Sequence, residues 1–222
     1  MGTRSDPTES LLPETRLVEV THVRQRFTWD CGIACVSMML YPEQRKDLLG
    51  NLLKIAEEEG FQKSTWTIDL AYLLKRFNIP CQFRTLTKGV DPSFSSKSFY
   101  QTFMNKDHPR VLRKFEEAEQ HGIDVQLESV PMDTILRHLN KHGPVIVLTN
   151  ARLLYCKNCG HNAPMRMLRN IFPTDGKGFD GHYITVVGYS LRNRRIYYRN
   201  PALKDAMENQ FATMYNLHVI PV

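Results

Sequence analysis

QRFTWDCGIAC, residues 25–35, is a polar segment that leads directly into an apolar run, residues 33–40. Asp30 is expected to cap a helix that begins at Cys31, because its carboxylate can accept hydrogen bonds from the free N–H groups of the first turn. The positive end of the helix dipole then favours a thiolate at Cys31. Gln25 can fold back and place an amide donor where an oxyanion would form during attack on a carbonyl. The stretch predicts a nucleophilic cysteine, with a buried structural cysteine as the alternative.

Two residues late in the chain supply the other groups that a nucleophilic cysteine needs. His182 stands just after a glycine at the start of an apolar strand, which gives a general base a rigid support. Asn200 follows the next strand, and pairing of the two strands would let its side chain accept a hydrogen bond from the imidazole. Considered separately, each feature has a structural interpretation: His182 as a surface histidine at the end of a strand, and Asn200-Pro201 as a turn.

The four residues together predict a catalytic group rather than separate structural features. In chain order they are an amide, a thiol, an imidazole and a second amide: Gln25, Cys31, His182 and Asn200. His182 would take the thiol proton while Cys31 attacks a carbonyl, and Gln25 would donate to the resulting oxyanion. We therefore expect a cysteine peptidase-like hydrolase that acts on a peptide or amide bond and needs no cofactor.

The order of the predicted elements indicates an α+β fold in which N-terminal helices pack on a mostly antiparallel sheet. Helical spacing of the apolar residues predicts helices at residues 31–41, 43–59 and 67–77. Strands are expected mainly later, and a short basic turn joins two of them into an antiparallel pair. The predicted strands cover residues 16–23, 80–87, 123–130, 144–149, 182–190 and 195–199.

The length of 222 residues fits one domain. Residues 1–14 are polar and contain two prolines, so we expect a disordered tail there. Residues 15–222 are expected to form a single domain. Within that domain, residues 150–181 are polar and irregular, which indicates a long loop of the kind that is usually functional or disordered.

The composition excludes several classes of function. The apolar runs are far shorter than the roughly 20 residues that span a bilayer, and no signature of a nucleic-acid-binding module accompanies the net charge of +6. Five cysteines without an export signal indicate a reducing compartment. We expect a protein of the cytoplasm, with the nucleus as a second compartment. Its expected partner is a peptide or protein substrate, and neither a membrane nor a nucleic acid.

A second cysteine cluster lies in the predicted long loop. Cys156 and Cys159 form a Cys-x-x-Cys pair with His161 nearby, which is half of a zinc site. The other half is not evident, because a closed structural zinc site needs about four ligands and only Cys81 remains as a further thiol beyond the first helix. Free thiols on a loop near the substrate are the favoured interpretation, and zinc is the alternative.

The order of the four candidate residues resembles the papain-like superfamily, especially its C39-like branch. The local sequence around His182, GHYI at residues 181–184 followed by VGY at residues 187–189, adds to this likeness. The resemblance implies a papain-like α+β fold. On the superfamily pattern, the oxyanion donor, nucleophile, base and orienting residue would be Gln25, Cys31, His182 and Asn200.

Three further runs resemble the guanylyl cyclase domain-containing protein family. They are WDCGIAC at residues 29–35, STWTIDLAYL at residues 64–73 and SFY at residues 98–100. The resemblance covers most of residues 16–205, and we expect residues 206–222 to depart from the family. The family name implies another chemistry, the conversion of GTP to cyclic GMP.

A cyclase would need carboxylates that hold magnesium and groups that bind the triphosphate. The available carboxylates share no recognisable spacing; they are Asp69, Asp91, Asp175 and Asp180. No glycine-rich phosphate loop in a strand–loop–helix context is present. The guanylyl cyclase therefore stays an alternative that would bring Mg²⁺ as cofactor, and a non-catalytic interaction domain is a third hypothesis.

Overall fold

The chain is a mixed α+β protein, as the sequence predicts. The computed structural model describes residues 11–61, 63–89, 98–151, 154, 181–204, 211–213 and 219–220. The helices are α1 (Cys31–Met39), α2 (Pro42–Gly50), α3 (Leu52–Glu58), α4 (Thr67–Arg76), α5 (Ser98–Glu117) and α6 (Met132–Lys141). The strands are β1 (Thr15–Leu17), β2 (Phe83–Thr85), β3 (Val125–Leu127), β4 (Val145–Asn150), β5 (Gly181–Ser190), β6 (Arg195–Arg199), β7 (Phe211–Thr213) and β8 (Val219–Ile220).

A six-stranded antiparallel sheet forms the centre of the molecule, with the order β7-β6-β5-β4-β8 and with β1 also paired to β5. The antiparallel pairing of the strands at 182–190 and 195–199 is confirmed by β5 and β6. The strands expected at 80–87 and 123–130 are shorter, and they form a separate parallel pair, β2 with β3. A strand of three residues has too few side chains to form an alternating apolar pattern. The sequence therefore does not indicate which other strand it pairs with.

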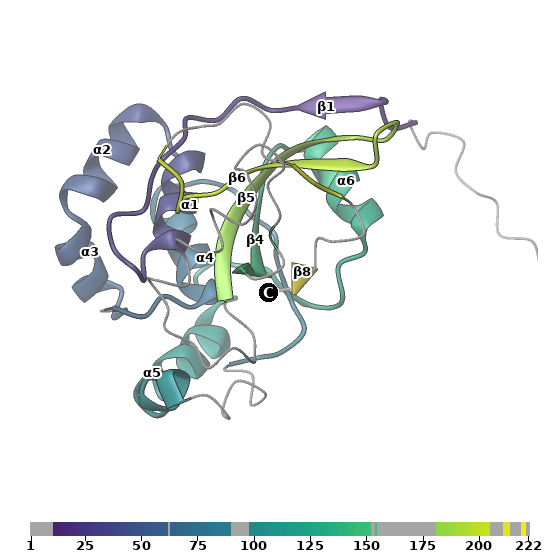
Figure 1. Cartoon of the computed structure of the whole chain (residues 1–222). Helices are drawn as coiled ribbons and strands as arrows, with labels where there is room; N and C mark the ends of the chain where they lie inside the picture. The colour runs from purple at the N-terminus through teal and green to yellow at the C-terminus, as the bar shows by residue number, and fades with distance from the viewer. Residues whose placement is uncertain are drawn as a thin grey trace, which may run out of the picture.

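Helices cover both faces of the sheet, because the side chains of its central strands are apolar on both sides. Tyr183 packs with α1 on one face, whereas Ile184 and Val186 pack with α6 on the other. Figure 1 shows α1 and α4 on one side of the β4–β5 pair and α6 on the other. The prediction that N-terminal helices pack on an antiparallel sheet is therefore confirmed.

The helix expected over residues 43–59 is two helices, because the chain breaks at Asn51 between α2 and α3. Gly50 and Asn51 have low helix propensity, and an asparagine favours helix ends, where it can bond to nearby backbone. Much of the predicted loop at 150–181 and most of the predicted tail at 1–14 lie outside the described residues. Within the described part of the chain, no helix is long and apolar enough to cross a bilayer.

A register shift lies in β5 between Val186 and Gly188. The extra residue keeps Tyr189 on the same face as Val186, where both pack with α6. At Gly188 the backbone of β1 approaches closely: a Cβ there would overlap the carbonyl oxygen of Arg16 and lie 3.0 Å from the Cα of Leu17. The absence of a side chain at Gly188 therefore allows β1 to pair with the distal half of β5.

We expect Gly188→Ala to destabilise the protein by about 1–3 kcal/mol, because β1 must move away from β5 to accommodate the methyl group. Urea unfolding followed by circular dichroism measures this loss. Gly50→Ala is the matched control, since nothing lies within 4 Å of a Cβ at the end of α2. The control should be neutral or stabilising by roughly 0.5–1 kcal/mol. Equal stability of Gly188→Ala and the wild type would contradict the close approach.

Candidate active site

Cys31 is the first residue of α1, as the sequence predicts, but Asp30 does not cap the helix through its side chain. The carboxylate of Asp30 turns back and accepts hydrogen bonds from the backbone N–H groups of Arg26 (3.0 Å) and Phe27 (2.9 Å). Its main-chain carbonyl accepts the N–H of Ala34 at 2.9 Å and so closes the first helical turn. The loop before the helix has unpaired N–H groups of its own, and these compete with the helix for the carboxylate.

The start of α1 lies directly against the start of β5. The backbone N–H groups of Tyr183 and Gly32 donate toward the sulfur of Cys31. Gly32 permits this approach, since a Cβ there would lie 2.9 Å from a methyl group of Leu70 and 3.0 Å from the ring of Tyr183. Cys31 therefore sits beside the residue that follows His182, although the two residues are far apart in the sequence.

His182 and Asn200 form the hydrogen bond that the sequence predicts. Nε2 of His182 lies 2.8 Å from Oδ1 of Asn200, and both side chains are buried. Because an amide oxygen only accepts, Nε2 carries the proton and Nδ1 is left with its lone pair. Asn200 is held in turn by the N–H of Ala202, which donates to the same oxygen at 3.0 Å. Among the described residues, Nδ1 has no hydrogen-bond partner.

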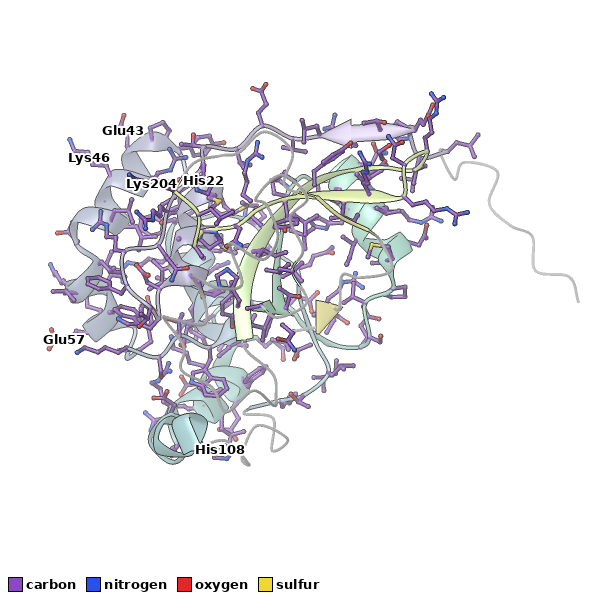
Figure 2. The ribbon with its side chains drawn as sticks, in the orientation of Figure 1. His22, Glu43, Lys46, Glu57, His108 and Lys204 are labelled. Carbon is purple, nitrogen blue, oxygen red and sulfur yellow. The ribbon has the colours of Figure 1, made fainter. Side chains whose placement is uncertain are left out.

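Gln25 lies beside the segment that carries Asn200. Its backbone N–H donates to the carbonyl of Pro201 at 2.9 Å. Three residues earlier, the imidazole of His22 donates through Nε2 to the carbonyl of Leu203 at 3.1 Å, and Figure 2 shows His22 next to Lys204. These contacts bring the segment before Cys31 to the end of β6. The side-chain amide of Gln25 donates to the carbonyl of Phe27 at 2.7 Å.

Burial dominates the electrostatics of the cysteine and the histidine. It raises the pKa of the Cys31 thiol to about 11, although the N–H groups of Tyr183 and Gly32 oppose this shift. It lowers the pKa of His182 to about 4, against the opposing effect of the hydrogen bond to Asn200. The expectation of a thiolate at Cys31 is therefore wrong for this state of the protein. Loss of water around the sulfur outweighs the helix dipole, and near pH 7 both groups are neutral.

The pKa values predict how Cys31 reacts with iodoacetamide. Alkylation follows the thiolate fraction, so its rate should be low at pH 7 and rise through pH 9 to 11. Site-resolved mass spectrometry measures the rate at each pH, and the half-buried Cys81 serves as an internal comparison. His182→Ala should leave the profile of Cys31 nearly unchanged. A plateau of reactivity below pH 8.5 that disappears in His182→Ala would instead reveal a thiolate–imidazolium pair.

Comparison with known proteins relates the chain to a family and to a relative. The sequence pattern of a family described as guanylylate cyclase matches residues 20–217. The expectation that residues 206–222 depart from this family is therefore wrong as far as residue 217. The chain belongs to this family. Guanylyl cyclase 1 of Arabidopsis thaliana is 30% identical to the chain over 191 residues, which is 86% of this chain and 67% of the relative. No solved structure matches the chain.

Membership of the guanylylate cyclase family agrees with the alternative activity rather than with the hydrolase. Neither the family pattern nor the Arabidopsis relative bears on the papain-like placement. They do not test the roles of the four candidate residues. These roles and the papain-like placement therefore stay predictions.

The described residues do not fit the magnesium site that a cyclase of this family would need. Asp69 is fully buried, and its carboxylate is already occupied by Arg110 and Lys114. No group of three or more histidine, cysteine or acidic side chains lies close enough to hold a metal within the described part of the chain. The other candidate carboxylates, Asp91, Asp175 and Asp180, lie outside the described residues.

The possible zinc ligands also fall outside the described residues: Cys156, Cys159 and His161. The three described cysteines, Cys31, Cys35 and Cys81, are free thiols. Cys35 lies one turn after Cys31 and is fully buried beside Thr185 of β5, where burial raises the pKa of its thiol. It packs as a core residue, in agreement with its place on the inner side of α1.

Proposed function

We propose that the chain carries a papain-like thiol hydrolase site that acts on a peptide or amide bond. The hydrogen bond from His182 to Asn200 is the observation that supports this proposal most directly. It fixes the imidazole with its basic nitrogen, Nδ1, free to accept a proton, at the point where the start of β5 meets the first residue of α1. A buried imidazole with one unpaired nitrogen is otherwise unfavourable in a protein core.

The neutral pair of Cys31 and His182 defines the first step. As Sγ of Cys31 bonds to the carbonyl carbon of the substrate, Nδ1 of His182 takes the thiol proton, and the carbonyl oxygen becomes an oxyanion. The backbone N–H of Cys31 and the amide of Gln25 donate to that oxygen. Nε2 of Gln25 has two hydrogens, and only one of them is used in the hydrogen bond to Phe27.

The second step regenerates the free thiol of Cys31. The oxyanion collapses and expels the amine, which leaves with the proton that His182 gives back. Water then attacks the thioester while His182 accepts its proton, and the acid is released as Sγ of Cys31 regains a proton. Asn200 keeps the imidazole in one orientation through both steps, since it accepts the Nε2 proton throughout.

A papain-like placement of the fold is part of this proposal. It is supported by a nucleophile at the N-terminus of a helix, α1, that packs on an antiparallel sheet. It is also supported by a base that follows Gly181 in β5 and by an orienting residue at the end of the neighbouring strand, β6.

A second candidate function is the conversion of GTP to cyclic GMP with release of pyrophosphate. Family membership and the name of the Arabidopsis relative favour it, and they favour it over the hydrolase. Such a reaction takes Mg²⁺, which would neutralise the triphosphate. The carboxylates in the described part of the chain do not fit a site for this ion.

One experiment on the full chain separates the two candidates. The protein is incubated with p-nitrophenyl acetate, and mass spectrometry locates the acetyl group. In parallel it is incubated with GTP and Mg²⁺, and chromatography measures cyclic GMP. Acetylation at Cys31 with release of p-nitrophenol supports the thiol hydrolase, whereas cyclic GMP without acetylation supports the cyclase. Neither product would favour the interaction domain.

A further inference from the structure

Asp30 is a buried carboxylate that bonds to the backbone of the preceding loop and not to the helix that follows it. Only 3% of it is exposed, and burial raises its pKa. A carboxylate without solvent is costly unless its oxygens are hydrogen-bonded. Here each oxygen accepts one backbone N–H, Oδ2 from Arg26 and Oδ1 from Phe27. The side chain therefore closes the loop of residues 26–30 upon itself, immediately before the cysteine.

The closed loop contacts the candidate oxyanion donor, Gln25. The N–H of Phe27 bonds to Asp30, and the carbonyl of Phe27 accepts the side-chain amide of Gln25 at 2.7 Å. The backbone N–H of Gln25 bonds to Pro201, next to Asn200. Gln25 is thus held by two separate contacts, one of its side-chain amide and one of its backbone. Its own oxygen, Oε1, is buried without a partner among the described residues, so the contact with Phe27 decides how the amide is turned.

The aromatic ring of Phe27 gives the same loop a further anchor. It stacks on the ring of Trp29 with the centroids 5.5 Å apart and the planes at 4°. Trp29 in turn packs against the core around α1. Even so, 48% of Phe27 is exposed, and stacking alone does not set the direction of its carbonyl. The two hydrogen bonds of the Asp30 carboxylate hold the two peptide units that come directly before this carbonyl.

We propose that Asp30 is a positioning residue: its carboxylate holds the backbone at Arg26 and Phe27, and so aims the amide of Gln25, which bonds to the Phe27 carbonyl, at the oxyanion formed on attack by Cys31. The inference rests on the proposed thiol hydrolase. In this role Asp30 does not contact the substrate. The effect that passes through Gln25 should appear only in a reaction that forms an oxyanion. Besides burial, the charge of Asp30 raises the pKa of Cys31, and this acts on every reaction of the thiol alike.

Two reactions of Cys31 separate this role from a general effect on the fold. Acetylation by p-nitrophenyl acetate forms an oxyanion on the carbonyl, whereas alkylation by iodoacetamide displaces iodide and forms none. The ratio of the two rates therefore reports the oxyanion donor. A loss of local packing around the thiol would change both rates together and leave the ratio unchanged.

The test compares the full-length wild type with Asp30→Ala, Asp30→Asn, Gln25→Ala and the double variant Asp30→Ala/Gln25→Ala. Removal of an oxyanion donor typically costs about 10²–10³-fold in rate. We expect Asp30→Ala to lower the ratio of acetylation to alkylation of Cys31 about tenfold or more. The change in the pKa of the thiol that follows from loss of the Asp30 charge affects both rates and cancels in the ratio. Asp30→Asn should lose less, since its amide keeps an acceptor oxygen for Phe27. The double variant should match Gln25→Ala alone, because the two residues act through one donor.

Three outcomes would overturn the inference. They are an unchanged ratio of rates, an equal loss in both reactions, or additive losses in the double variant. Asp30→Asn keeps the test valid if Asp30→Ala does not fold. Failure of the proposed function is a different result: the wild type itself would not be acetylated at Cys31, and the role of Asp30 would fall with it.

Discussion

Cys31→Ala is expected to abolish acyl transfer from p-nitrophenyl acetate. The variant has no sulfur to bond to the carbonyl carbon, so no thioester can form. Loss of a nucleophile commonly costs about 10⁶-fold in rate in enzymes with a catalytic triad. The release of p-nitrophenol, measured in the burst and in the steady state, should fall to that of buffer.

The matched control is Cys81→Ala, which removes a half-buried thiol that lies outside the site. It should keep the burst of the wild type. A burst that survives in Cys31→Ala would exclude Cys31 as the nucleophile. Cyclic GMP that forms equally in the wild type and in Cys31→Ala would assign the family activity to another part of the chain.

Asp69→Ala is expected to destabilise the protein by about 3–5 kcal/mol. The carboxylate is fully buried and joins α4 to α5. It forms an ion pair with Lys114 at 3.0 Å and a two-pronged contact with Arg110, and it accepts the backbone N–H of Trp66 at 2.9 Å. Removing it leaves the buried Lys114 and the half-buried Arg110 without their shared partner. Urea unfolding measures the free energy of unfolding.

Asp133→Ala is the control for this prediction. Asp133 also pairs with an arginine, Arg137, but on the exposed surface of α6, where 61% of the aspartate side chain is accessible. Its loss should change the free energy of unfolding by no more than about 0.5 kcal/mol. Equal effects of the two substitutions would contradict the structural role of Asp69. A loss of activity in Asp69→Ala would accordingly report unfolding and would not identify a metal ligand.

The sequence predicts the parts of this structure that follow from periodicity and punctuation. The helix at Cys31 and the pairing of the strands around His182 and Asn200 follow from apolar spacing, a proline and a short turn. Strand pairing then makes the hydrogen bond from His182 to Asn200 predictable, because it sets the two side chains on one face at one end of the sheet.

Other features depend on tertiary contacts and could not be predicted. The pKa of Cys31 is set by the amount of water that the packed residues exclude, which no local pattern encodes. The direction of the Asp30 side chain depends on which of two sets of free N–H groups lies closer, and both choices suit an aspartate before a helix. The one local indication of its actual partners is their spacing, since Phe27 and Arg26 lie three and four residues before Asp30.

The pairing of β5 on both sides has a consequence for the order of folding. Its first half bonds to β4 and its second half to β1, while β6 runs along the opposite edge. β1 is formed near the N-terminus and β5 near the other end of the chain, so the central strand closes large loops as it enters the sheet. Long-range closure of this kind is slow compared with helix formation. The cysteine helix can therefore form early, whereas β5, which carries His182, joins it only in one of the last steps of assembly.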